Sequence, residues 1–251
     1  GKPGRIFLHS CLAEIQHEYN IHFTMANIEN AAKGFGVTEP VYQELSGLGV
    51  QMFTSGNHIY DKKDIVKVID HLPKLIRPYN FPKGTPGAGY KIVSHAGVKV
   101  GIINLIGRVF MNPSDCPFHA VEALLPTIRE QTPIIFVDFH GEATSEKQAM
   151  GWFLDGKVSC VFGTHTHVQT ADARLLYEGT GYISDLGMVG SFDSILGMQK
   201  EPIVKKFFNQ MHTKFEPGPQ SHVILNAIVV KVDTETGKAI HIQRIFKEGH
   251  F

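Results

Sequence analysis

Side chains able to bind metal ions follow four apolar segments of the chain, each at the point where the segment ends. They are Glu29-Asn30 after residues 21–26, Gly56-Asn57-His58 after residues 50–54, His140 after residues 134–139, and Gly163-Thr-His165-Thr-His167 after residues 158–162. Separate strand ends can converge on one point, and a metal ion needs several nitrogen and oxygen ligands there. The repeated placement therefore predicts a metal centre.

Each motif alone has a simpler explanation. A single His at a strand end is usually hydrogen-bonded, Asn57-His58 fits an ordinary turn, and Glu29-Asn30 fits a helix cap. The His165-x-His167 pair is more specific, because alternate residues of an extended segment point the same way. The combination of all four favours a site. We interpret the ten remaining histidines as structural or solvent-facing: His9, His17, His22, His71, His95, His119, His212, His222, His241 and His250.

The elements that must position these motifs alternate between helix and strand patterns along the first two-thirds of the chain. Helices are predicted at residues 5–19, 38–48, 61–72 and 145–154, and strands at residues 21–26, 50–54, 90–94, 98–105, 134–137 and 158–162. A hairpin is predicted from residues 222–232 and 239–246. This order predicts an α/β fold with a mixed sheet or two packed sheets and helices outside. The site should lie at the carboxyl ends of the strands.

Composition limits the kind of protein further. The 251 residues show no break in composition, so we expect a single domain over residues 1–251. Net charge is zero, so the composition does not indicate a binding site for long nucleic acid or a polybasic patch that would bind a membrane. No apolar run reaches the roughly 18–20 residues of a membrane span, and no signal peptide begins the chain. Three widely spaced cysteines are typical of thiols in a reducing compartment, so we expect a cytoplasmic location.

The motifs also resemble a known signature. Gly56-Asn57-His58, the later His140 and Gly163-Thr-His165-Thr-His167 are similar to the motifs of calcineurin-like metallophosphoesterases. Finer matches are Ile28-Glu-Asn-Ala-Ala32, Arg77-Pro-Tyr-Asn-Phe-Pro82, Asp138-Phe-His-Gly-Glu-Ala-Thr-Ser-Glu-Lys147 and Gly163-Thr-His-Thr-His-Val-Gln-Thr-Ala-Asp172. These resemble the bacterial YmdB-like branch, described as 2′,3′-cyclic-nucleotide phosphodiesterases. The resemblance covers essentially the whole chain and implies a four-layer α/β/β/α sandwich of two mixed sheets flanked by helices.

Carried over by position, the resemblance implies two metal ions, iron or manganese. Glu29 would bridge both ions, because a carboxylate has two oxygens. The remaining ligands would be Asn30 and His167 on one ion, and Asn57, His140 and His165 on the other. Because Asn and His ligands are neutral, much of the positive charge of the metal ions stays uncompensated, which favours binding of an anionic phosphodiester.

The implied reaction is hydrolysis of a cyclic nucleotide to a 3′-nucleotide by a metal-bridging hydroxide. His58 would be the general acid that protonates the departing ribose oxygen. Asp138 and Glu142 flank His140 and either orient ligands or have ordinary surface or capping roles. The loop at residues 187–197 is a candidate to close over the substrate.

One departure and two alternatives qualify this interpretation. The family opens with a strand ending in Gly-Asp, and that Asp binds a metal, whereas this sequence begins at Gly1-Lys2-Pro3-Gly4-Arg5. We therefore expect the first strand and its ligand to be missing. A catalytically impaired regulator that binds metal or nucleotide is one alternative, and a phosphomonoesterase or nuclease is the other. The expected partner is a small cyclic nucleotide or phosphodiester, and homo-oligomerisation is left open.

Overall fold

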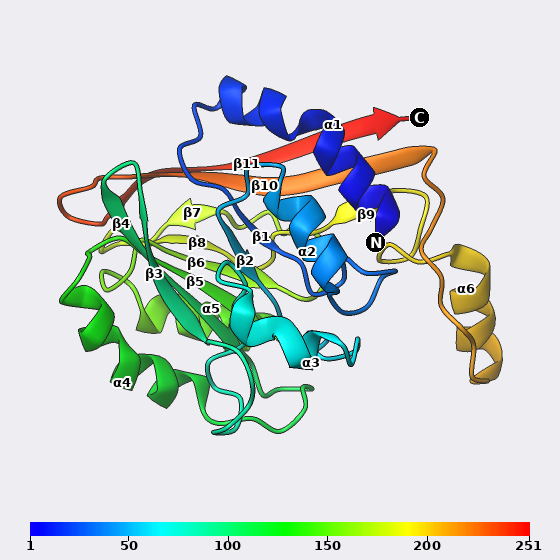
Figure 1. Cartoon of the computed structure of the whole chain (residues 1–251), viewed down its shortest axis with the longest axis horizontal. Coiled ribbons are helices and arrows are strands. Elements are labelled where there is room, and N and C mark those ends of the chain that lie inside the picture. The colour runs from blue at the N-terminus through cyan, green and yellow to red at the C-terminus, as the bar shows by residue number, and fades with distance from the viewer.

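The strands form three hydrogen-bonded sheets in a computed structural model that describes all residues 1–251 (Figure 1). The largest sheet has the order β3-β4-β5-β6-β8-β7. Its strands are β3 (Tyr90–His95), β4 (Val98–Ile106), β5 (Ile135–His140), β6 (Cys160–Thr164), β7 (Arg174–Leu175) and β8 (Gly181–Ile183). A parallel pair consists of β1 (Met25–Asn27) and β2 (Met52–Thr54). The third sheet is antiparallel and consists of β9 (Val189–Ser191), β10 (His222–Val232) and β11 (Ala239–His250).

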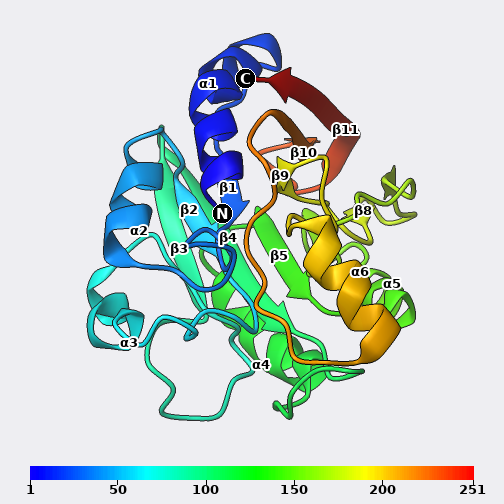
Figure 2. The same cartoon turned by 90° about the vertical axis from the view of Figure 1, so that its right-hand side faces the viewer.

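Helices cover the outer faces of these sheets (Figures 1 and 2). Apolar residues of α1 (Lys2–Glu18) pack on the β9–β11 sheet, and residues of α4 (Pro117–Arg129) and α5 (Thr144–Phe153) pack on the six-stranded sheet. The β1–β2 pair shares its apolar cluster with α2 (Glu39–Ser46) and α3 (Ile65–Val68). By contrast, α6 (Lys200–Asn209) projects from the body of the molecule, with Phe207 and Phe208 exposed.

The two inner layers meet through apolar side chains that alternate along the strands. Met52 of β2 packs with Ile102 of β4, and Ile228 of β10 packs beside Phe162 of β6. The expected α/β/β/α layering is therefore confirmed. The layer opposite the six-stranded sheet differs in detail, because it contains two separate sheets, β1–β2 and β9–β11.

Several helices depart from the sequence-based prediction. Residues 61–72 form only a short α3 followed by a 3₁₀ turn, Ile69–His71, and the carboxylate of Asp61 contacts His58. Helix α4 was not predicted, although Val121, Leu124, Leu125 and Ile128 have helical spacing and are buried. Helix α6 was not predicted either, although Ile203, Val204, Phe207 and Phe208 have helical spacing; of these only Ile203 is buried.

The parallel strands place their carboxyl ends at one side of the inner layers. β1 runs parallel to β2, and β4, β5 and β6 run parallel in register, with His140 directly beside Thr164. Loops that follow β1, β2 and β6 therefore begin close to the last residue of β5. No helix in this structure combines the length and the apolar character needed to cross a membrane.

Candidate metal centre

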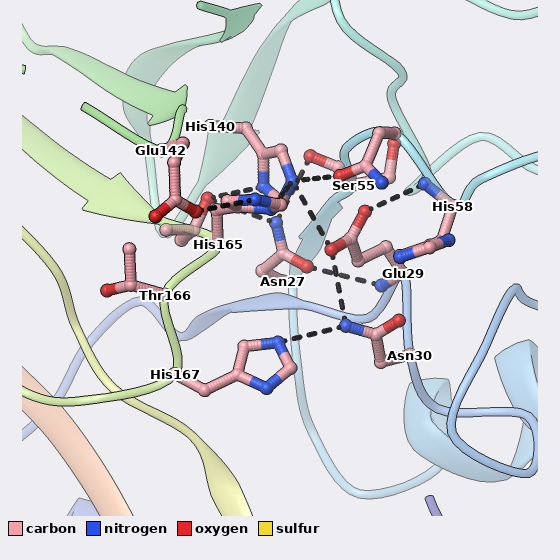
Figure 3. Close-up of polar contacts among 12 residues, drawn as sticks. Asn27, Glu29, Asn30, Ser55, His58, His140, Glu142, His165, Thr166 and His167 are labelled. Atoms are coloured by element: carbon pink, nitrogen blue, oxygen red, sulfur yellow. Dashed lines mark hydrogen bonds and ion pairs between the residues drawn. The ribbon is translucent and has the colours of Figure 1, made fainter. Parts of the chain in front are cut away.

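The four strand ends bring all six predicted ligands into one polar cluster, most of which is drawn in Figure 3. His140 is the centre of the first group and is fully buried. Its Nε2 atom lies 2.7 Å from Asn57 Oδ1, 3.1 Å from His165 Nδ1 and 3.3 Å from Glu29 Oε1. Glu29, His140 and His165 each place a ligand atom within 4.8 Å of the others, as a shared metal ion requires.

A second group lies on the other side of Glu29. The amide nitrogen of Asn30 is 3.2 Å from Glu29 Oε1 and 3.1 Å from His167 Nε2. The amide oxygen of Asn30 is buried and has no hydrogen-bond partner, which is costly for a polar atom. Glu29 thus contacts both groups, which contain the same residues as the two ligand sets expected from the sequence.

Each of the three histidines turns its outward ring nitrogen toward an oxygen. The outward nitrogens of His140 and His167 donate hydrogen bonds, and that of His165 lies within ion-pair distance of a carboxylate, so the other nitrogen of each ring faces the cluster. The three pairs are His140 Nδ1 to Thr164 Oγ1 at 2.9 Å, His165 Nε2 to Glu142 Oε2 at 3.1 Å, and His167 Nδ1 to Leu196 O at 3.1 Å. The inward nitrogens of His140 and His165 face each other, and that of His140 also faces Asn57 Oδ1. The inward nitrogen of His167 accepts from the amide nitrogen of Asn30.

Burial favours the neutral form of these groups. It lowers the pKa of His140 well below its usual value, and the nearby His165 lowers it further. Burial also lowers the pKa of His165. Burial raises the pKa of Glu29 to about 8, despite the hydrogen bond from the His58 backbone N–H. The neutral imidazoles, the unpartnered oxygen of Asn30 and the buried carboxylate of Glu29, whose negative charge a cation would stabilise, together form a donor set that fits metal ions.

Asp138 lies below the ligands and fixes the orientation of His140. The hydroxyl proton of Thr164 goes to Asp138 at 2.6 Å, so the Thr164 oxygen must accept from His140 Nδ1. Thr54 and Asn27 also donate to Asp138, which ties β1, β2, β5 and β6 to one carboxylate. Burial raises the pKa of Asp138 to about 6, although the Thr hydroxyls oppose the shift. A supporting role for Asp138 was one of two possibilities predicted from the sequence, but its three partners, which lie on other strands, were not predicted.

The segment that carries His165 and His167 is not extended, so the expected reason for their convergence was wrong. Both residues have positive φ, +110° and +65°, a strained conformation for residues other than Gly. The chain therefore turns after β6, and each ring faces a different ligand group. The buried pair Lys147–Asp185 holds this turn, because Asp185 accepts the backbone N–H of Thr166 at 2.9 Å.

Gly56 is required where the loop after β2 crosses the end of β5. A Cβ atom at this position would collide with the imidazole ring of His140. The backbone can thus pass close to the ring and deliver Asn57 to it. Gly56 is therefore required for a steric reason and stands directly before the candidate ligand Asn57.

His58 lies at the edge of the cluster and contacts no ligand through its ring hydrogen bonds. Its Nδ1 atom is 2.8 Å from Asp61 Oδ2, and its ring packs edge-on against Phe35. The backbone N–H of His58 donates to Glu29 Oε2 at 3.0 Å. The ring is thus held beside Glu29 with its Nε2 atom free (Figure 3). Asp61 was not identified from the sequence, although it stands three residues after His58 in the same motif.

Comparison with known proteins gives whole-chain matches. The family described as YmdB-like protein matches residues 1–245. The 2′,3′-cyclic-nucleotide 2′-phosphodiesterase of Bacillus subtilis is 46% identical over 245 residues, which are 98% of this chain and 92% of that protein.

Two solved structures are similar throughout. A hypothetical protein from Thermus thermophilus has a TM-score of 0.91 at 35% identity, covering 98% of this chain and 94% of its own. A Mycoplasma pneumoniae protein described as a novel phosphatase has a TM-score of 0.93 at 32% identity, covering 100% of this chain and 90% of its own. Family match, sequence identity and fold agree with the motifs at the strand ends, and the chain therefore belongs to the YmdB-like family of calcineurin-like metallophosphoesterases.

Proposed function

We propose that this chain is a metal-dependent phosphodiesterase that hydrolyses 2′,3′-cyclic nucleotides at a dinuclear centre. The observation that carries the proposal is that ligand atoms of Glu29, His140 and His165 lie within 4.8 Å of one another, beside an Asn30–His167 pair that also contacts Glu29 through Asn30. The substrate class is supported by the Bacillus subtilis relative, a 2′,3′-cyclic-nucleotide 2′-phosphodiesterase at 46% identity.

The contacts support a division of the ligands between two ions. Glu29 would bridge them, since its Oε1 atom lies 3.2 Å from the Asn30 amide and 3.3 Å from His140. Asn30 and His167 would hold one ion, and Asn57, His140 and His165 the other. We expect iron or manganese. When bound, the ions would neutralise phosphate charge and provide an acidified water near neutral pH. Asn30 can turn its unpartnered oxygen inward by rotating its amide, without any backbone change.

His58 is assigned to the leaving group. Opening the cyclic phosphate at the 2′ position releases a ribose alkoxide, which needs a proton, and leaves the phosphate on the 3′ oxygen. Asp61 accepts from Nδ1 of His58 and fixes the ring, so Nε2 is the atom that delivers the proton. Phe35 restricts the ring from the side.

The proposal is tested by product analysis. The purified chain, loaded with Mn²⁺, should convert 2′,3′-cyclic AMP to 3′-AMP, and a chelator should stop turnover. The comparison substrate is 3′-AMP, which a phosphomonoesterase would hydrolyse to adenosine and phosphate. Formation of 2′-AMP, or turnover unaffected by the chelator, would contradict the proposal.

Replacing His58 should separate proton donation from metal binding. We expect His58→Gln to lower kcat for 2′,3′-cyclic AMP by about 10²–10⁴-fold, because general acid catalysis contributes that much. Hydrolysis of bis(p-nitrophenyl) phosphate should change little, since p-nitrophenolate leaves without a proton. Steady-state kinetics on both substrates, with bound Mn²⁺ measured in parallel, checks this. An equal loss on both substrates would mean that His58 does not act on the leaving group.

Thr164 should affect metal affinity through His140. In Thr164→Val the Nδ1 proton of His140 loses its acceptor, and we expect the Kd for Mn²⁺ to rise by about 10–100-fold. Thr164→Ser is the matched control, because it retains the hydroxyl that accepts from His140 and donates to Asp138. Equilibrium dialysis measures both affinities. Equal Kd values for the two variants would show that the hydroxyl does not orient the ring.

A further inference from the structure

A second group of metal-competent side chains lies at the end of the β10–β11 hairpin and shares no residue with the phosphodiesterase centre. We propose that His222, Glu248 and His250 bind a divalent transition-metal ion. Their ligand atoms all lie within 4.8 Å of one another. Both histidines were interpreted from the sequence as structural or solvent-facing, because the strand register that unites them is not visible there.

Strand pairing explains why the three side chains share one face. His222 on β10 is the direct partner of His250 on β11. Glu248 stands two residues before His250, and alternate residues of a strand point to the same side. Cross-strand partners on one face have Cβ atoms about 4.5–5.5 Å apart. The hairpin therefore places two imidazoles and one carboxylate side by side.

His222 is held in a ligand-like orientation. Its Nδ1 atom lies 3.4 Å from Asp193 Oδ2, while its Nε2 atom lies 3.4 Å from Glu248 Oε2. The Nε2 atom is shielded from solvent yet makes no hydrogen bond, so an ordinary His–Glu hydrogen bond does not explain its position. A carboxylate on one ring nitrogen and an ion on the other is the usual arrangement around a metal-binding His. The ring of Phe192 packs against the His222 ring, with centroids 4.5 Å apart, and restricts its rotation.

The site needs only a small closure to hold an ion. Tetrahedral zinc with bonds of about 2.0–2.1 Å places its ligand atoms about 3.4 Å apart. The His222–Glu248 separation already equals 3.4 Å. The His250 ring stacks on His222 with centroids 4.3 Å apart, and exposed side chains such as Glu248 and His250 can rotate inward. Two imidazoles with one carboxylate select Zn²⁺, Co²⁺ or Ni²⁺ over Mg²⁺ or Ca²⁺.

Zinc stoichiometry tests the site in the full chain. We expect His250→Gln to bind one Zn²⁺ fewer per chain than the unmodified protein, by equilibrium dialysis and elemental analysis. The catalytic ligands are intact in both proteins and contribute equally. His241→Gln is the matched control, because His241 is exposed on the same strand and its side-chain hydrogen bond is to Gln243. Mn²⁺-dependent phosphodiesterase activity should be unchanged in both variants. Equal Zn²⁺ binding by His250→Gln and the unmodified protein would overturn the proposal.

A second variant tests the geometry rather than the ligand count. Asp193→Asn should raise the Kd of the His250-dependent Zn²⁺ by about 10–100-fold, as expected for loss of the carboxylate that orients a ligand. The Co²⁺-loaded protein should also show visible absorption typical of a tetrahedral site, and this part of the spectrum should be missing in His250→Gln. An unchanged Kd in Asp193→Asn, or a Co²⁺ spectrum identical in His250→Gln, would contradict the assigned arrangement.

Discussion

Glu29→Gln should abolish the stabilisation of the protein by Mn²⁺ while leaving the metal-free protein as stable as before, or more stable, at pH 8. The carboxylate is only 2% exposed and contacts both ligand groups. Without a cation, a buried charge destabilises the fold, and a neutral amide of the same shape removes that cost. The amide can keep its hydrogen bonds, because Asn30 can rotate its unpartnered oxygen to accept from Gln.

The pH dependence has a definite sign. Burial raises the pKa of Glu29 from 4.5 to about 8, so the folded state retains a proton that the unfolded chain has lost. Between about pH 4.5 and 8 the folded state binds more protons, and the free energy of unfolding of the metal-free protein must fall as pH rises. Glu29→Gln removes this contribution, whereas the contribution of Asp138 remains in both proteins. Chemical unfolding of metal-free protein at pH 5 and pH 8.5 measures the difference.

Metal should reverse the order of stability of the two proteins. A ligand at 100 times its Kd stabilises the folded state by about 2.7 kcal/mol per site. We expect that increment in the unmodified protein and little of it in Glu29→Gln, with a loss of kcat/KM of at least ~10³-fold, since metal ions supply several kcal/mol of transition-state stabilisation. Glu201→Gln, on exposed α6, is the control and should behave as the unmodified protein. A full metal-induced rise in melting temperature in Glu29→Gln would exclude a bridging role.

The positions of the candidate ligands could be predicted because they depend on strand ends. Short apolar runs followed by polar residues reveal a buried parallel strand, and parallel strands deliver their carboxyl ends to one side. Glu29, Asn57, His140 and His165 all follow this rule. The residues that orient them could not be found in this way. Thr54 and Asn27 lie inside β2 and β1 and meet Asp138 only through sheet packing, for which the sequence has no local signal.

Local backbone conformation is the second feature that the sequence did not predict. The His165-x-His167 spacing suggested an extended segment, yet the positive φ values of both residues depend on the loop that follows β6. Similarly, residues 61–72 have helical periodicity, yet the helix begins only at Ile65, and Asp61 contacts His58. Helical or strand periodicity does not reveal such local departures.

Removal of Lys147 should destabilise the protein strongly. Its ammonium group lies 2.7 Å from Asp185, with side chains only 3% and 1% exposed. Lys147→Met keeps the apolar stem but leaves the Asp185 charge buried without its partner, which typically costs about 3–5 kcal/mol. That is a large fraction of the roughly 5–15 kcal/mol that stabilises a folded domain. Urea unfolding measures the change, and Lys214→Met, in an exposed ion pair with Glu216, should leave the midpoint unchanged.

The double variant Lys147→Met with Asp185→Asn separates the ion pair from the turn that it supports. The Asp185→Asn change removes the unpaired charge, so stability should recover in large part relative to Lys147→Met alone. Metal affinity should recover less, because the two oxygens of Asp185 accept backbone N–H groups from Thr166 and Gly187, and an amide offers only one oxygen. Thr166 stands between His165 and His167, whose strained backbone needs that anchor. If stability and Mn²⁺ affinity recovered together, the pair would contribute only to the core and not to the ligand turn.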